Sequence, residues 1–157
     1  MTQLTYNATP AVATLGMIAE LLTTNVIDSY LVQAATPMIK FGVAVTYGTA
    51  AGTVKPVGNV TDKFVGVAVF AQELNVNGTN GSTGAAYLAY EQLPIMHKGR
   101  IWVEAGEALA LGDPLFVEVT NGVQWFNDSA TSTRLPVNGS VRTAASAPGA
   151  LVEIELW

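Results

Sequence analysis

Alternation of apolar and polar residues is the main pattern of this chain from residue 41 onward. Period-two patterns predict strands with one buried face, because successive side chains of a strand point to opposite sides. The predicted strands are residues 41–47, 64–70, 100–104, 115–120, 123–126 and 152–156. Turn residues such as glycine, proline and asparagine separate them. No long helical pattern follows residue 36, so the predicted fold class is all-β, a small β-barrel or β-sandwich.

The clearest local element is a hairpin around Asn121-Gly122, which lies between two apolar runs. Asn-Gly suits a type I′ turn, because both central residues of that turn need a positive φ. A two-residue loop places Val117 opposite Phe126, where the two side chains can pack on the same side of the sheet.

The first 36 residues differ from the rest. They contain no lysine or arginine and only one glycine, and threonine recurs through them. Apolar residues at helical spacing allow a short helix near 17–23, while Pro10 and Pro37 favour extended backbone before them. We predict an extended N-terminal arm over residues 1–36 and a β domain over 37–157. The alternative is that 1–36 form a first strand and a loop of the same domain.

Length and composition bound the kind of protein. The chain has 157 residues, which is enough for one domain with its own core. Half of the residues are hydrophobic and only 12% are charged, against about 25% in an ordinary soluble domain. No uninterrupted apolar run approaches the ~18 residues of a membrane-spanning helix. The surplus apolar surface therefore predicts contact with another protein.

Charge and cysteine content exclude several classes of partner. Seven basic and twelve acidic residues give a formal net charge of −5. The basic residues are scattered, so we expect neither nucleic-acid binding nor binding to an anionic membrane. The absence of cysteine excludes disulfides and thiolate metal sites and fits synthesis in a reducing cytosol. The first 30 residues lack the positive region of a secretory signal, so we expect no export by that route.

Candidate catalytic groups are few. His97 is the only histidine, and at the end of a predicted strand it fits a structural, hydrogen-bonded role. Four acids cluster in the sequence: Glu104, Glu107, Asp113 and Glu118. A hydrolase would use Glu104, Glu107 or Asp113, but acids beside glycine turns are normally solvated. The glycine-rich stretch 75–84 lacks the lysine of a phosphate-binding loop. We predict no enzyme activity, no metal and no cofactor.

Aromatic residues leave two functions open. Stacking on sugars and packing in a core or subunit interface both use such side chains. The candidates are Tyr87, Tyr90, Trp102, Trp125 and Phe126. Trp157, a large apolar residue at the last position, is typical of docking against a partner.

Several ordered segments of the chain resemble one family, the structural cement (capsid decoration) proteins of tailed bacteriophages. The segments that carry the resemblance are Tyr6-Asn7, Pro10-Ala11, Gly16-Met17-Ile18-Ala19, Phe41-Gly42-Val43-Ala44-Val45, Phe64-Val65-Gly66-Val67-Ala68-Val69, Gly99-Arg100-Ile101-Trp102-Val103, Leu111-Gly112-Asp113-Pro114-Leu115-Phe116-Val117 and Gly149-Ala150-Leu151-Val152-Glu153-Ile154. Their order and spacing, rather than any one of them, make the match.

The resemblance implies a virion protein on the outer surface of the icosahedral head, made in the host cytoplasm. Such proteins clamp neighbouring major capsid proteins, stabilise the shell without catalysis, and are often homotrimers with an arm that reaches over adjacent subunits. The partners it implies are the major capsid protein and further copies of the chain.

The interface residues that follow are of two kinds. We expect Tyr6, Pro10, Met17 and Ile18 to dock the arm, and Arg100, Trp102 and Trp157 to make subunit or core contacts. The alternative function is a carbohydrate-binding or adhesive module on the head surface that would use Trp102, Trp125 and the polar loops.

Overall fold

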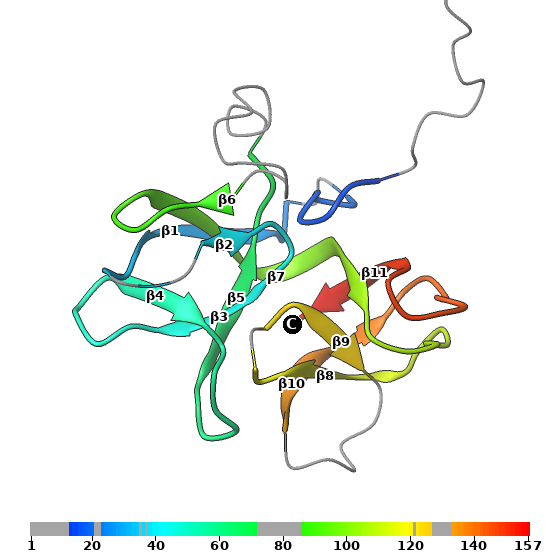
Figure 1. Ribbon diagram of the computed structural model, residues 1–157. Helices are drawn as coiled ribbons and strands as arrows, with labels where there is room; N and C mark the ends of the chain where they lie inside the picture. The colour runs from blue at the N-terminus through cyan, green and yellow to red at the C-terminus, as the bar shows by residue number, and fades with distance from the viewer. Residues whose placement is uncertain are drawn as a thin grey trace, which may run out of the picture.

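Figure 1 shows the computed structural model of the protein, which describes residues 13–20, 23–34, 36, 38–71, 86–120, 122–126 and 133–157. In these residues the chain forms strands and no helix, which confirms the all-β prediction. The strands in chain order are β1 (Val26–Val32), β2 (Ile39–Lys40), β3 (Ala44–Tyr47), β4 (Thr53–Pro56), β5 (Phe64–Ala68), β6 (Ala86–Tyr87), β7 (Gln92–Ala105), β8 (Pro114–Glu118), β9 (Gln124–Phe126), β10 (Arg134–Val141) and β11 (Leu151–Leu156). No helix that could cross a membrane occurs within the described ranges.

Nine of these strands form one sheet that closes on β7 twice. The strand order is β1-β4-β3-β5-β7-β11-β10-β8-β9, and both β1 and β9 also pair with β7. The first ring thus consists of β1, β4, β3, β5 and β7, and the second of β7, β11, β10, β8 and β9. In Figure 1, β7 runs between the first-ring strands on the left and the second-ring strands on the right. The sheet is closed into a small barrel-like body rather than split into the two sheets of a sandwich.

Each ring contains one parallel pair. β1 runs parallel to β4, and β9 runs parallel to β7, whereas the other neighbours in both rings are antiparallel. Strand direction cannot alternate all the way around a ring of five, so at least one parallel pair is unavoidable. The pair β2–β6 forms a separate two-stranded sheet.

The strands bury two hydrophobic cores on opposite faces of a shared wall. The first core is Val32, Ile39, Phe41, Val43, Val45, Val54, Val65, Ala68, Tyr87, Leu93 and Ile95. The second core is a larger cluster around Trp125, Ile101 and Ile154. In β3, β5 and β7, adjacent residues belong to different cores. Val45, Ala68 and Ile95 lie in the first core. Their chain neighbours Ala44, Val67 and Met96 lie in the second core. β3, β5 and β7 therefore form a wall with a core on each side.

This wall corrects the prediction of one buried face for residues 64–70, and it explains the short apolar run at residues 41–47. Residues 41–46 and 65–69 are buried without alternation. A strand covered on both faces needs apolar or small residues at nearly every position, which is why these runs are almost continuously apolar. The predicted alternation does hold in β11, where Val152, Ile154 and Leu156 are buried.

Part of the range predicted as an arm, residues 1–36, forms strand β1 of the sheet. Ile27 to Leu31 pair with β7 in antiparallel register, and Val32 is fully buried in the first core. Residues 26–32 therefore match the alternative, a first strand of the same domain. Residues 17–20 form no helix, so the short helix expected near 17–23 is absent there, and Ile18 makes an isolated bridge instead. β1 was missed because five of its seven residues are exposed, so its sequence shows little alternation.

The hairpin forms, but its register is one residue away from the prediction. Val117 pairs with Trp125, and Phe116 pairs with Phe126. The connection occupies residues 119–123 rather than two residues, and the Gly122 N–H donates to the Glu118 carbonyl at 2.9 Å. The parallel pairing of β9 with β7 also restricts where β9 can lie, and this constraint is invisible in the local sequence.

We expect Trp125→Ala to lower the free energy of unfolding by about 3–5 kcal/mol, because it removes a large, fully buried side chain from the second core. The control is Trp157→Ala, at a side chain that is 59% exposed, where we expect a change of about 0.5 kcal/mol or less. Denaturant unfolding followed by circular dichroism measures both. Equal losses would contradict the placement of the two residues.

Candidate interaction surface

The N-terminal segment of residues 16–19 runs antiparallel alongside the second half of β7. The Gly16 N–H donates to the Trp102 carbonyl at 2.8 Å, and the Trp102 N–H donates to the Met17 carbonyl at 3.0 Å. The Ala19 N–H donates to the Arg100 carbonyl at 2.9 Å, and Ile18 forms an antiparallel bridge with Ile101. This docked segment (residues 16–19) therefore continues the hydrogen bonding of the sheet.

Gly16 fastens the docked segment to the strand wall. Its φ is +73°, and a Cβ atom there would lie 2.8 Å from the Ala68 carbonyl oxygen and 2.8 Å from the Phe41 Cβ. The Gly16 carbonyl also accepts a hydrogen bond from the Phe70 N–H at 2.8 Å. Only glycine combines this backbone conformation with so close an approach. The segment is therefore joined to both β7 and the end of β5.

Four of the predicted interface residues meet at this segment. Ile18 is partly buried and packs against the second core. Because side chains alternate along a strand, Met17 lies on the outer side, as do Arg100 and Trp102. Met17 is 38% exposed, and Trp102 is half-buried. We call Met17, Arg100 and Trp102, together with Glu153 and Glu155 of β11, the outer β7 surface.

Arg100 is already paired within the chain. Its guanidinium lies 3.0 Å from a carboxylate oxygen of Glu20, 3.7 Å from one of Glu153 and 3.6 Å from one of Glu155. Glu155 also contacts Arg142. Such partly exposed pairs contribute only about 0–1 kcal/mol each. Their geometric effect is to connect the residue after the docked segment with β7 and β11.

Trp157, another predicted interface residue, lies away from this surface. Trp157 borders a hollow of about 240 Å³ that is also lined by Phe64, Val65, His97, Pro136, Val137 and Asn138. None of these residues belongs to the outer β7 surface. Tyr6 and Pro10 lie outside the described residues.

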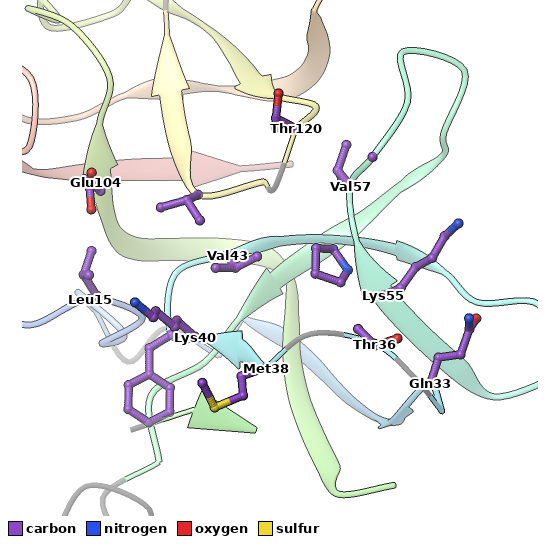
Figure 2. Close-up of a pocket in the computed structure, with 14 residues that line it drawn as sticks. Leu15, Gln33, Thr36, Met38, Lys40, Val43, Lys55, Val57, Glu104 and Thr120 are labelled. Carbon is purple, nitrogen blue, oxygen red and sulfur yellow. The ribbon is translucent and has the colours of Figure 1, made fainter. Parts of the chain in front are cut away.

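A larger cleft, of about 760 Å³, was not predicted from the sequence. Figure 2 shows that Lys40, Lys55, Val57, Glu104 and Thr120 come from different parts of the fold to line it. Its other lining residues are mostly apolar and include Leu15, Met38, Phe41, Val43, Pro56 and Val123. The cleft has no local sequence signal, because only the closure of the two rings brings these segments together.

The candidate carboxylates have separate structural surroundings. Glu107 pairs with Arg134 at 3.8 Å, and Asp113 accepts the Ala110 N–H at 2.7 Å. Glu118 accepts the Thr120 hydroxyl at 3.0 Å, and Glu104 lines the cleft. Among the residues that the structure describes, no group of three or more His, Asp or Glu could hold a metal ion.

The aromatic candidates for sugar stacking are mostly unavailable. Trp125 is fully buried, so its assignment to a glycan-binding surface is wrong. Tyr87 and Phe126 are buried as well, and the Arg134 guanidinium carbon lies 3.7 Å from the centre of the Phe126 ring. Tyr90 is 73% exposed, and Trp102 is half-buried beside the docked segment.

His97 lies inside β7 rather than at the end of a strand as predicted, and its contacts are structural. Its Nδ1 lies 2.6 Å from the Val65 carbonyl oxygen, and its Nε2 lies 3.3 Å from an Asp28 carboxylate oxygen. The ring also meets Tyr30 edge to face, with centroids 5.9 Å apart. Burial raises the pKa of the Tyr30 phenol above its usual value, and Tyr47 and Asp28 add to this shift. These groups connect β1 to β5 and β7.

We expect Gly16→Ala to destabilise the protein more than Gly52→Ala. Both glycines have a φ of +73°, but no atom lies within 4 Å of a Cβ added at Gly52. The two variants share the cost of a left-handed backbone, about 1–2 kcal/mol, and only Gly16→Ala adds a clash with backbone atoms. Thermal unfolding and hydrogen exchange of the Trp102 amide measure the effect. Equal melting temperatures would show that the docked segment is not held as described.

Known proteins resemble this chain in sequence and in fold. The family described as "Structural cement protein (E217 gp24/Pam3 gp6)" matches residues 2–156. A chain from the solved structure "The capsid of Myoviridae Phage XM1" has a similar fold, with a TM-score of 0.71 and 12% sequence identity. The alignment covers 95% of this chain and 92% of that one. No curated protein matches the sequence. Because the family match spans nearly the whole chain, this protein belongs to the structural cement proteins of phage capsids.

Proposed function

We propose that this protein binds the outer surface of an icosahedral phage head, where it links neighbouring major capsid proteins and stabilises the shell. The family match over residues 2–156 carries the proposal. We infer that the protein is made in the host cytoplasm and joins the virion there. We infer no catalytic step and no cofactor.

The charge of the chain supports an outer position. The formal net charge is −5, and a negative protein is repelled by the phosphates of packaged DNA. Of the seven basic residues, Arg100, Arg134 and Arg142 are engaged with carboxylates of the chain itself. Their charge is thus largely neutralised at short range.

The body suits a mechanical role. A wall that is buried on both faces leaves little freedom for the strands that carry it, because close-packed interiors resist deformation. The docked segment adds backbone hydrogen bonds between the N-terminal part of the chain and β7. Force applied at the N-terminal side would therefore reach the centre of the sheet. We propose that Tyr6 and Pro10, together with Met17, contact the shell in the manner of an arm.

We expect the protein to co-sediment with shells of its cognate major capsid protein and to raise their disassembly temperature, because a ligand stabilises the state that it binds. Deletion of residues 1–12 should weaken binding at least about tenfold, equivalent to about 1.4 kcal/mol. The truncated chain retains the docked segment, so its own melting temperature serves as the control. Unchanged binding would exclude a role for the arm, and no binding of the full chain would contradict the proposed function.

We expect a homotrimer in solution or on the shell. Sedimentation velocity of the free protein should give a mass about three times the chain mass of 16.4 kDa, or a map of decorated shells should show the copies in clusters of three. A monomer that also occupies isolated positions on the shell would contradict this arrangement.

A further inference from the structure

Among the described residues, one edge of β1 has no partner strand along most of its length. β1 pairs antiparallel with β7, but it pairs with β4 only at Leu31 and Val32. From Val26 to Tyr30, no described strand lies along the edge that faces away from β7. An edge of this kind presents backbone groups that another extended chain can use.

The direction of these backbone groups follows from the hydrogen bonds at the end of β1. The Leu31 N–H donates to the Gly52 carbonyl at 3.0 Å, on the β4 side, whereas the Val32 N–H donates to the Glu91 carbonyl at 2.9 Å, beside β7. Because backbone groups alternate along a strand, Ile27 and Ser29 direct their N–H and C=O groups to the same edge as Leu31. Among the described residues, no backbone partner meets these two donors and two acceptors.

The side chains along this edge are unusually apolar for an exposed strand. Val26 is 45% exposed, Ile27 is 39% exposed and Leu31 is 47% exposed. Tyr47, which packs edge to face against Tyr30, is 53% exposed. Proteins usually block a free edge with lysine, proline or a covering segment. We define Ile27, Ser29 and the exposed side chains Val26, Leu31 and Tyr47 as the free β1 edge.

We propose that the free β1 edge binds an extended segment of the capsid shell protein as an added strand, a mode of contact that rests on the proposed function. The segment would exchange hydrogen bonds with Ile27 and Ser29 and would cover the apolar side chains beside them. Opposite Asp28 it would carry a lysine or arginine.

Charge distinguishes this partner from a second copy of the chain. A symmetric antiparallel pair that used all four free groups would place Ile27 opposite Ser29 of the second copy, and therefore Asp28 opposite Asp28. Like charges directly opposite each other destabilise a sheet. Asp28 is 62% exposed although it contacts His97, so its charge remains accessible to a cationic residue. The chain itself, with a net charge of −5, is a poor source of such a segment.

The test removes one backbone donor. Ser29→Pro deletes the N–H group of Ser29, which makes no hydrogen bond within the described protein, whereas Ser29→Ala keeps it. In co-sedimentation with shells of the cognate major capsid protein, we expect Ser29→Pro to weaken binding at least tenfold and Ser29→Ala to stay within twofold. Asp28→Lys should weaken binding more than Asp28→Asn. Circular dichroism and thermal unfolding verify that each variant is folded.

A measurement on the unaltered chain covers the case in which Ser29→Pro does not fold. Amide exchange at Ile27 and Ser29 should be fast in the free protein and slow on the shell, while exchange at Tyr30 should be slow in both. Equal exchange of Ile27 and Ser29 in the two states would overturn the added strand. The added strand would also be overturned if Ser29→Pro bound shells as tightly as the wild-type chain. A dimer of the free protein that only Ser29→Pro dissociates would overturn it as well. Failure of the wild-type chain to bind shells would overturn the proposed function as well.

Discussion

The whole structure depends on β7 being shared by two closed rings. At 14 residues it is the longest described strand, and it pairs with β1, β5, β11 and β9. Its first half contributes Leu93 and Ile95 to one core, and its second half contributes Ile101 and Val103 to the other. Gly99 lies between the halves with a φ of +127°, where an added Cβ would collide with the Asn25 side chain. Distortion of β7 would therefore disturb both cores at once.

Closure has consequences for the surface. A closed ring has no edges, and this removes most of the unpaired backbone that an open sheet would expose. The first ring, however, is closed by a parallel pair of only two residue pairs, Leu31 with Thr53 and Val32 with Val54. Because β1 and β4 overlap so briefly, the rest of β1 has one edge with no partner strand in the described part of the chain. The short β1–β4 overlap that closes the first ring thus also leaves Val26 to Tyr30 without a described partner strand on that side.

The docked segment and the ion pairs of Arg100 bear on the proposed role of the protein in the capsid. The docked segment of residues 16–19 holds the N-terminal part of the chain against β7, and Gly16 permits the close contact. The ion pairs of Arg100 with Glu20, Glu153 and Glu155 lie over the same region. The proposed linking of neighbouring subunits requires a body that carries force without unfolding, and the docked segment is hydrogen-bonded to the strand that both cores share.

The sequence by itself determined the strand class, the strands around Val65, Ile101 and Ile154, the hairpin at Gly122 and the family, because these depend on local periodicity, turn chemistry and motif order. It also predicted contact roles for Met17, Ile18, Arg100 and Trp102, and the fold brings these four residues together. Only the tertiary structure decided that β1 belongs to the sheet, that Trp125 is buried and that the hairpin register differs by one residue. Each of these depends on pairing between segments far apart in the chain. Burial on both faces of the wall and the free edge of β1 follow from ring closure, which no local pattern of residues records.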